Sequence, residues 1–338
     1  MEHLDKQELI QLIENGTKNG NDEIMRQAGA VRAEIFGNRV FVRGLIEISN
    51  YCKQNCYYCG IRNSNKAIAR YRLSKEQILS CCETGFNLGL RTFVLQGGED
   101  DYFDVGYMTD IILEIRGKYP ECAITLSLGE KDDTTYREYF NAGANRYLLR
   151  HESANESHYS RLHPKSQILE NRKKCLYLLK EIGFQVGAGF MVGSPFQTPE
   201  ALADDILFLK ELEPHMVGIG PFIPSAATPF KNYRPGTLAQ TLFMISLVRV
   251  MLPFSLMPST TALASISPKG RELGLLAGAN VIMPNLSPCE ARANYAIYDN
   301  KASFGAEAAE GLSLLNNKLK DSGFCLDYSR GDFCAFYK

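Results

Sequence analysis

The sequence lacks an excess of charge of either sign. Its 338 residues include 37 Lys and Arg against 38 Asp and Glu, which gives a formal net charge of −1. A chain this close to neutral has no general electrostatic attraction for nucleic acid or for an anionic membrane surface. The composition therefore predicts neither of them as a partner.

Long hydrophobic runs are also missing. The most apolar stretch, residues 241–258, is interrupted by Arg249 and Pro253, whereas a membrane-spanning helix needs about 20 mainly apolar residues. Residues 1–7 are rich in charge and contain no apolar core of the kind that a signal peptide has. We therefore expect a folded protein of the cytoplasm.

Low-complexity tracts and linkers are absent too, and short apolar runs instead alternate with amphipathic segments. The spacing of apolar residues predicts a helix over residues 6–36. Strands are predicted at 43–49, 92–96, 123–128, 146–150, 185–190, 217–221, 256–260 and 280–284, and helices between them at 75–88, 104–118, 133–141, 168–182, 199–212 and 238–251. This alternation predicts an α/β fold, a complete (β/α)8 barrel of the TIM type, with an open doubly wound sheet as the alternative. We expect an N-terminal helical extension over 1–40, the barrel over 41–290, and a C-terminal extension over 291–338 that packs on it.

The first four predicted strands are polar on one face. In the first, Arg43, Glu47 and Ser49 alternate with Ile46 and Ile48. The same period of two separates Gln96 from Leu95, Thr125 from Leu126, and Arg150 from Leu149. Buried parallel strands are ordinarily apolar on both faces. The pattern therefore predicts helices against the apolar face and a polar barrel interior.

Three of the ten cysteines lie within eight residues, directly after the first predicted strand. Cys52, Cys56 and Cys59 have the spacing Cys-x3-Cys-x2-Cys, and the loop after a barrel strand lies at the catalytic face. Three free thiols or a zinc site are possible readings, and zinc would need a fourth ligand such as His151. Three thiolates also suit a 4Fe-4S cluster that keeps one iron open.

The cysteines, with Tyr58 directly before the last of them, resemble the signature of the radical S-adenosylmethionine (SAM) superfamily. The Gln-Gly-Gly-Glu-Asp run at 96–100 resembles the glycine-rich segment of that superfamily. Further segments narrow the resemblance to the HydE family of FeFe-hydrogenase maturases, in the biotin-synthase-like branch. They are residues 43–49, 91–100, 125–130, 147–152, 189–195, 215–224, 258–262 and 278–288.

The resemblance implies an enzyme with a 4Fe-4S cluster on Cys52, Cys56 and Cys59 that cleaves SAM reductively to methionine and a 5′-deoxyadenosyl radical. It implies SAM contacts from Tyr58, Gly97, Gly98, Ser127, Glu152, Arg172 and Met191. It also implies a substrate site lined by Arg43, Gln96, Thr125, Arg150, Thr260, Thr261, Tyr295 and Tyr298. Buried arginines need anionic partners, so we expect Glu47 to pair with one and an anionic substrate with the other. A self-contained network of ion pairs is the alternative.

The family's role is to assemble the diiron subcluster of the hydrogenase H-cluster. By resemblance, the substrate is an iron complex made by HydG, the product passes to HydF, and an external one-electron donor reduces the cluster. Some members hold a second cluster on extra cysteines, but residues 295–305 contain none and Cys289, Cys325 and Cys334 are dispersed. We therefore expect a single cluster. The alternatives are a related enzyme, such as methylornithine synthase or a biotin-synthase-like enzyme, and a non-catalytic Fe-S or zinc protein.

Overall fold

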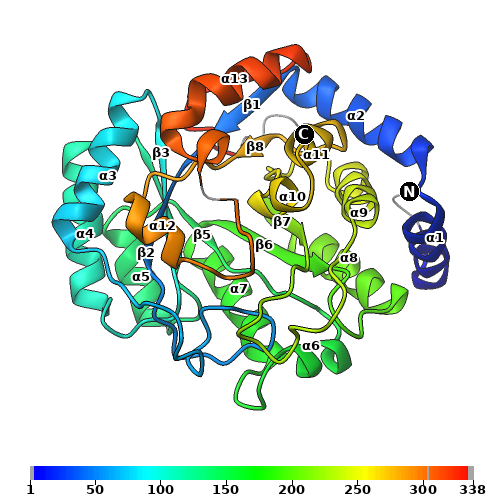
Figure 1. The fold of residues 1–338 in the computed structure, drawn as a ribbon, viewed down its shortest axis with the longest axis horizontal. Helices are drawn as coiled ribbons and strands as arrows, with labels where there is room; N and C mark the ends of the chain where they lie inside the picture. Colours follow the sequence, from blue (N-terminus) through cyan, green and yellow to red (C-terminus); the bar gives the residue numbers. More distant parts are fainter. Residues whose placement is uncertain (1–3, 303, 334–338) are drawn as a thin grey trace.

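A ring of parallel strands surrounded by helices makes up most of the molecule (Figure 1), a computed structural model that describes residues 4–302 and 304–333. Strands β2 to β7 form a six-stranded parallel sheet in chain order. The strands are β1 (Arg39–Val42), β2 (Gly44–Ser49), β3 (Thr92–Gly97), β4 (Ala123–Ser127), β5 (Arg146–Leu148), β6 (Gln185–Val192), β7 (Met216–Pro221), β8 (Val281–Ile282) and β9 (Cys325–Asp327).

Short parallel contacts close this sheet into a complete barrel. Residues 256–258 run between β7 and β8, with parallel bridges from Met216 to Leu256 and from Pro258 to Val281. Strand β8 pairs with β1, which continues through Arg43 into β2, and Leu45 bridges to Asn285. The ring therefore has eight strand positions, which confirms the predicted (β/α)8 barrel. The domain boundaries at residues 40 and 290 stay predictions.

The helices begin where the sequence supplies side-chain caps. Ser74 and Thr237 form reciprocal capping boxes with Gln77 and Gln240, and Pro199 occupies the first helical turn after Thr198. The helices that follow β2 are α3 (Lys75–Asn87), α4 (Val105–Lys118), α5 (Asp133–Asn141), α6 (Glu156–Leu162), α7 (Leu169–Ile182), α8 (Pro199–Leu212), α9 (Leu238–Met251), α10 (Thr261–Ile266), α11 (Gly270–Leu276), α12 (Cys289–Asn294) and α13 (Leu312–Asp321), with single turns η1 (Gly305–Glu307) and η2 (Ala309–Gly311). Within residues 4–302 and 304–333, none of the helices combines the length and the hydropathy of a membrane-spanning segment.

The N-terminal extension differs from the prediction of one helix over residues 6–36. It consists of α1 (Lys6–Asn19) and α2 (Asp22–Phe36). Gly20 has a φ of 74°, and the Asn21 side chain accepts a hydrogen bond from the Ile24 N–H. The apolar period continues across this Gly-Asn step, but the positive φ ends one helix and the Asn cap starts the next.

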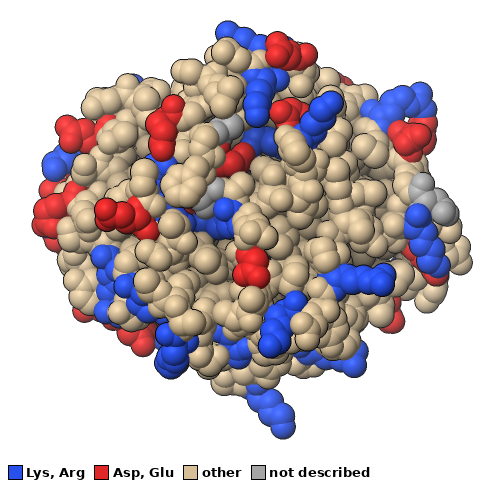
Figure 2. All heavy atoms as spheres, viewed as in Figure 1, with Lys and Arg blue, Asp and Glu red and all other residues tan. Residues whose placement is uncertain are grey.

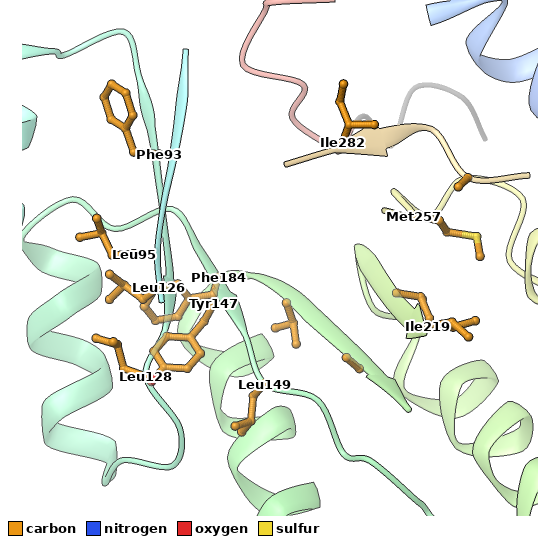
Figure 3. Close-up of a cluster of buried hydrophobic side chains, with 14 of the residues drawn as sticks. Phe93, Leu95, Leu126, Leu128, Tyr147, Leu149, Phe184, Ile219, Met257 and Ile282 are labelled. Carbon is orange, nitrogen blue, oxygen red and sulfur yellow. The ribbon is translucent and has the colours of Figure 1, made fainter. Parts of the chain in front are cut away.

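The apolar strand faces pack outward against the helices. Leu126, Leu128 and Leu149 belong to one large buried cluster (Figure 3). The same cluster also contains Ile111 of α4 and Leu176 of α7. Ile46, Ile48, Phe93, Leu95 and Ile124 lie in the same cluster. The predicted alternation of faces is therefore confirmed, and the opposite faces of these strands point into the barrel.

The C-terminal segment closes the barrel at the amino ends of the strands. Strand β9 pairs with β1 through Arg39 and Cys325. Beyond it, the Arg330 carbonyl accepts hydrogen bonds from Thr92 and Arg146, at 2.8 and 2.7 Å. The opposite end of the barrel, at the carboxyl ends of the strands, is not covered by this segment, and the cysteine loop lies there.

Candidate active site

The cysteines lie on the loop of residues 50–74 between β2 and α3. Neighbouring loops hold it through the backbone: Lys53 N–H donates to Glu99, Tyr57 to Leu162 and Gly60 to Ile297. Within the loop, the Arg70 guanidinium donates to the carbonyls of Asn50, Ile61, Arg62 and Asn65. This arginine, which the sequence did not single out, replaces the backbone hydrogen bonds that an irregular loop lacks.

Two glycines let other segments approach the loop closely. A Cβ on Gly98 would lie 2.2 Å from the Tyr51 carbonyl oxygen and 2.6 Å from the Cβ of Cys52. A Cβ on Gly60 would lie 2.2 Å from the Ala296 carbonyl oxygen. Gly97 is less crowded, because its Cβ would meet Ile48 and Ser49 at 3.4 Å. In this structure Gly98 is therefore needed for contact with the cysteine loop.

Burial makes the three thiols weak acids. It raises the pKa of Cys52 and Cys59, and it raises the pKa of Cys56 to about 12. Cys52 also raises the pKa of Cys56, and Cys52 and Cys56 both raise the pKa of Cys59, as expected of thiols on one short loop. They become thiolates only when positive charge is supplied, as iron does on binding. The donor set fits a cluster whose irons each take one thiolate.

A single-ion zinc site fits less well. Among the described residues, no three His, Cys, Asp or Glu side chains converge on one metal position. His151, the candidate fourth ligand, accepts a hydrogen bond from Gly189 N–H at 3.3 Å through Nδ1, and its Nε2 lies 3.3 Å from Asp205. Nδ1 is thus engaged by β6, and Nε2 faces Asp205 of α8 without a hydrogen bond, so His151 points toward α8 and β6.

Tyr58 and Met191 pack together beside the cysteines. They belong to a small cluster with Leu162 and Phe222, and the Tyr58 hydroxyl lies 3.1 Å from Nε2 of His163. Ser127 ends β4 and is partly exposed. The three residues thus come from the cysteine loop, β6 and β4, all at the carboxyl end of the barrel. Their contact with SAM stays a prediction.

Glu152 is held in a rare backbone conformation. Its φ is 63°, and its N–H donates to the Gly189 carbonyl at 3.0 Å. Its carboxylate lies 3.2 Å from the Arg150 guanidinium, yet Oε2 accepts no hydrogen bond within the described residues. A non-glycine residue at positive φ stores strain that surrounding contacts must hold. The carboxylate therefore has capacity for a donor, such as a hydroxyl or ammonium group.

Arg172 is tied to other protein groups. Its Nε donates to Glu130 at 2.5 Å, and its Nη1 donates to the Arg150 carbonyl at 2.9 Å. Glu99 lies 3.9 Å away. Glu130, which the sequence reasoning missed, therefore shares the guanidinium that the resemblance assigns to SAM.

Several buried polar atoms inside the barrel make no hydrogen bond within the described part of the chain. Thr125 Oγ1, Thr260 Oγ1 and Nε and Nη2 of Arg150 are buried without a hydrogen bond among the described residues. Gly220 of β7 leaves room for one of these side chains, because a Cβ there would lie 3.0 Å from Thr260 Oγ1. Buried polar groups are normally satisfied, so this interior suits a polar ligand.

The other predicted substrate-site residues near the carboxyl ends of the strands surround the same interior. Gln96 donates to the Tyr295 hydroxyl at 3.4 Å, and Tyr298 lies beside Ser265 of α10. Thr261 is partly exposed as the first residue of α10. Burial raises the pKa of both tyrosines, so they stay neutral donors at ordinary pH.

Glu47 and Arg43 have partners other than those expected. Glu47 is fully buried and forms an ion pair with Lys301, so it does not pair with an arginine. Arg43 donates to the Gly331 carbonyl at 3.2 Å and contacts Met216 at the first residue of β7. The structure thus places Arg43 at the closed end, away from Arg150 and the cysteines. Lys301 comes from a segment with no sequence signal for such a role.

Comparison with known proteins gives the context of this site. The sequence model of the radical SAM superfamily matches residues 46–209. That range includes the cysteine loop, Gly98, Glu152 and Arg172.

Two characterised relatives extend the match beyond this range. The FeFe-hydrogenase maturase subunit HydE of Thermotoga maritima is 46% identical over 281 residues, covering 83% of this chain and 80% of the relative. The 3-methylornithine synthase of Methanosarcina barkeri is 31% identical over 296 residues, covering 85% and 82%.

Two solved structures share the fold over nearly the whole chain. The methylornithine synthase crystal structure matches with a TM-score of 0.83 and 26% identity, covering 96% of this chain and 94% of the other. The maturase HydG of Carboxydothermus hydrogenoformans matches with a TM-score of 0.83 over 98% of this chain and 78% of the other. At 23% identity, that second match shows the fold alone.

Proposed function

Because the chain belongs to the HydE family of FeFe-hydrogenase maturases, within the radical SAM superfamily, we propose that it cleaves SAM reductively for assembly of the hydrogenase diiron subcluster. One observation carries this proposal most directly. Three clustered thiols lie at the open end of a barrel whose interior holds unpartnered polar groups. A metal-binding loop above a polar interior is the arrangement that a radical reaction on a polar substrate needs.

The three cysteines would hold a 4Fe-4S cluster, and Glu152, Tyr58, Met191 and the glycine-rich segment would hold SAM. When bound and reduced, the cluster supplies the electron that splits the sulfonium bond of SAM into methionine and a 5′-deoxyadenosyl radical. The protein's own residues bind and orient. The Gly98 contact fixes the loop, and the strained Glu152 backbone places a carboxylate with spare acceptor capacity.

The substrate would be anionic, an iron complex or a small molecule. Arg150 offers Nε, which has no partner among the described residues, and Nη2, which lies 3.2 Å from the Glu152 carboxylate without a hydrogen bond to it, and Thr125 and Thr260 offer hydroxyls that can donate to the substrate. A guanidinium fork suits an anion because it can donate two parallel hydrogen bonds. The wall of the site near the carboxyl ends of the strands would be completed by Thr261, Tyr295 and Tyr298. Arg43 would act only on a ligand that reaches the closed end of the barrel.

The partners would be those of hydrogenase maturation: HydG as the supplier of the substrate, HydF as the acceptor of the product, and an external one-electron donor. The nine described cysteines are all free thiols, as expected in a reducing cytosol. We propose that the protein works there.

Cleavage of SAM tests the enzyme assignment. Anaerobically reconstituted protein, reduced with dithionite, should form 5′-deoxyadenosine, and Cys56→Ala should lose at least about 100-fold because one cluster ligand is gone. Cys289→Ala is the matched control, since Cys289 is exposed on α12, and it should keep the parent rate. Absence of 5′-deoxyadenosine from the parent would contradict the proposal.

Methylornithine synthase is the second candidate, favoured by the TM-score of 0.83 at 26% identity. The two functions predict different results for a deletion strain and for the purified protein. A deletion strain that still matures its FeFe hydrogenase would remove the maturase assignment. Formation of 3-methylornithine by the purified protein, supplied with SAM, reductant and the substrate of that synthase, would support the second candidate.

A further inference from the structure

The polar pair His151 and Asp205 lies between β6 and α8, and His151 stands directly between Arg150 and Glu152 in the chain. Figure 2 shows Lys, Arg, Asp and Glu side chains spread over the surface, where water solvates them. His151 and Asp205 are instead 0% exposed, and Nε2 of the histidine lies 3.3 Å from Oδ1 of the aspartate. Because burying polar groups is costly, the contacts of this pair indicate what it does.

The chain carries one extra residue at this point of the barrel wall. Leu149 N–H donates to the Gly187 carbonyl at 2.9 Å, and Glu152 N–H donates to the Gly189 carbonyl at 3.0 Å. Three steps along the chain after β5 thus match two steps along β6, whereas a regular parallel pair matches two with two. Such a bulge re-aims side chains and is common beside active sites. Here the Arg150 guanidinium and the Glu152 carboxylate lie 3.2 Å apart.

The His151 ring holds this bulge against β6. Its Nδ1 accepts a hydrogen bond from Gly189 N–H at 3.3 Å, so the residue that accepts from Glu152 also donates to the histidine. Gly189 has a φ of 148°, and a Cβ there would lie 2.0 Å from the Gly218 carbonyl oxygen. Strand β6 is therefore packed closely against β7 at this point and offers the bulge a rigid partner.

Asp205 and two aromatic rings hold the histidine from the other side. Because Nδ1 accepts a hydrogen bond, the proton of the neutral ring is on Nε2, which faces Asp205. Asp205 Oδ1 also accepts from Ala154 N–H at 2.5 Å. The His151 ring lies 5.0 Å from the ring of Phe208 and 5.9 Å from that of Phe190. These contacts fix the orientation of the ring, and burial keeps it neutral by lowering its pKa to about 3.

We propose that His151 is a positioning residue for SAM, which keeps the Glu152 carboxylate in its binding position before SAM arrives. The inference rests on the proposed function, because that function makes Glu152 a SAM contact. Glu152 has a φ of 63°, a conformation that persists only where surrounding contacts hold it. Through Gly189, His151 supplies such a contact. A carboxylate that is already in place loses less freedom when its ligand binds, so SAM binds more tightly.

Two amide substitutions separate the contacts of the ring. In His151→Asn the side-chain oxygen can take the place of Nδ1 and accept from Gly189 N–H, whereas in His151→Gln the amide reaches the place of Nε2 and that acceptor is lost. Equilibrium dialysis of labelled SAM against anaerobically reconstituted, oxidised protein measures the affinity. We expect a loss of about tenfold for Gln, the upper value for one hydrogen bond, and of at most about threefold for Asn. Equal losses, or a larger loss for Asn, would overturn the inference.

His215 is the matched control, because it makes the same type of hydrogen bond near the other end of β6. Its Nδ1 accepts from Val186 N–H at 2.9 Å. His215→Asn and His215→Gln should both keep the SAM affinity within about twofold of the parent, since additive sites far apart do not couple. A loss in His215→Gln as large as that in His151→Gln would overturn the inference, because it would follow from general destabilisation of β6.

A double-mutant cycle tests whether His151 acts through Glu152. Glu152→Ala removes the carboxylate that His151 is proposed to position. In that background, His151→Gln should weaken SAM binding by no more than about twofold, because the positioned group is already gone. A further loss as large as in the parent background would overturn the inference, since the histidine would then act on the fold in general.

Hydrogen exchange gives a readout that does not need SAM. In the parent without SAM the Glu152 amide should be protected, and it should exchange about tenfold faster in His151→Gln than in His151→Asn. A parent amide that exchanges freely until SAM is added would overturn the inference even if no variant folds, because SAM itself would then place the carboxylate. A parent whose Glu152 amide is protected but which binds no SAM would instead contradict the proposed function.

Discussion

At the residue scale, the absence of a side chain at Gly98 lets the segment after β3 approach the backbone of the cysteine loop closely. Gly98 follows β3 and touches the carbonyl of Tyr51 and the Cβ of Cys52. The glycine-rich segment is expected by resemblance to contact SAM, but its second glycine also fixes where the first cluster ligand lies. Backbone atoms cannot move aside as a flexible side chain can, so a methyl group here must displace the loop.

Gly98→Ala should therefore reduce cluster binding. We expect a loss of about 2 kcal/mol or more in stability, the usual cost of overpacking, and a fall in bound iron after reconstitution. Gly117→Ala is the matched control: no atom lies within 4 Å of its Cβ position, on α4. Alanine there should stabilise the helix by about 0.5–1 kcal/mol. Equal iron content in the two variants would contradict the role given to Gly98.

A buried histidine should make stability depend on pH. His158 lies 2.9 Å from the Ser153 hydroxyl, and burial lowers its pKa to about 4. The unfolded chain, with an ordinary His pKa of about 6.5, binds a proton between pH 6.5 and 4 that the folded protein does not. Stability contributed by the neutral side chain is therefore present above pH 6.5 and is lost as the pH falls.

His158→Gln should flatten this dependence. Between pH 6 and 5, the slope of unfolding free energy against pH should fall by about 1 kcal/mol per pH unit. Urea unfolding at several pH values measures the slope. The difference in unfolding free energy between variant and parent at pH 8 gives any loss of packing, which is independent of protonation. An unchanged slope would show that His158 is protonated equally in both states.

At the scale of elements, the C-terminal segment completes the closed end of the barrel. The Arg146 side chain is 3% exposed, and its guanidinium donates to Asp332 at 2.7 Å and to the Arg330 carbonyl. Asp332 also accepts from Gln185 of β6. One carboxylate thus connects the last described residues to two barrel strands, because burial leaves Arg146 in need of a negative partner.

Asp332→Ala should destabilise the protein by about 2 kcal/mol, less than the roughly 3–5 kcal/mol lost on breaking a fully buried ion pair, because Asp332 is itself partly exposed. Chemical denaturation measures the change. Asp321→Ala, at the exposed end of α13, should change stability by less than about 0.5 kcal/mol. If both substitutions cost the same, the tail does not hold the closed end through this pair.

At the scale of the whole molecule, the dispersed cysteines lie at opposite ends of the barrel. Cys289 follows β8 at the carboxyl ends of the strands, and Cys325 pairs with Arg39 at the amino end of β1. Cys334 lies outside the described residues. Cluster ligands must surround one site, so this separation supports the proposal of a single cluster.

Iron analysis tests that proposal. Reconstituted protein should bind about four irons per chain, the content of one 4Fe-4S cluster, and a variant with Cys289 and Cys325 both changed to Ala should bind the same amount. About eight irons per chain, with loss of half of them in that variant, would contradict it.

The sequence was sufficient for the features that depend on near neighbours along the chain. The alternation of Leu126 and Leu128 with Thr125 determines which strand face meets the helices, because side chains alternate at every residue. The spacing of Cys52, Cys56 and Cys59 likewise places three thiols on one loop. The helix predicted over residues 6–36 failed at Gly20 and Asn21, where two local signals override an apolar period that continues through them.

Tertiary structure alone decided which groups meet inside the barrel. Glu47 and Lys301 are 254 residues apart, and Arg43 meets Gly331 rather than Arg150 or the cysteines. The alternation of side chains along the strand predicts that Arg43 points into the barrel. It does not predict where along the barrel axis Arg43 meets a partner, since that position depends on the stagger of the strands and on the path of the C-terminal segment. Near neutrality is a property of the sequence, whereas only the fold decides where the charges lie, because it brings segments far apart along the chain together around the barrel.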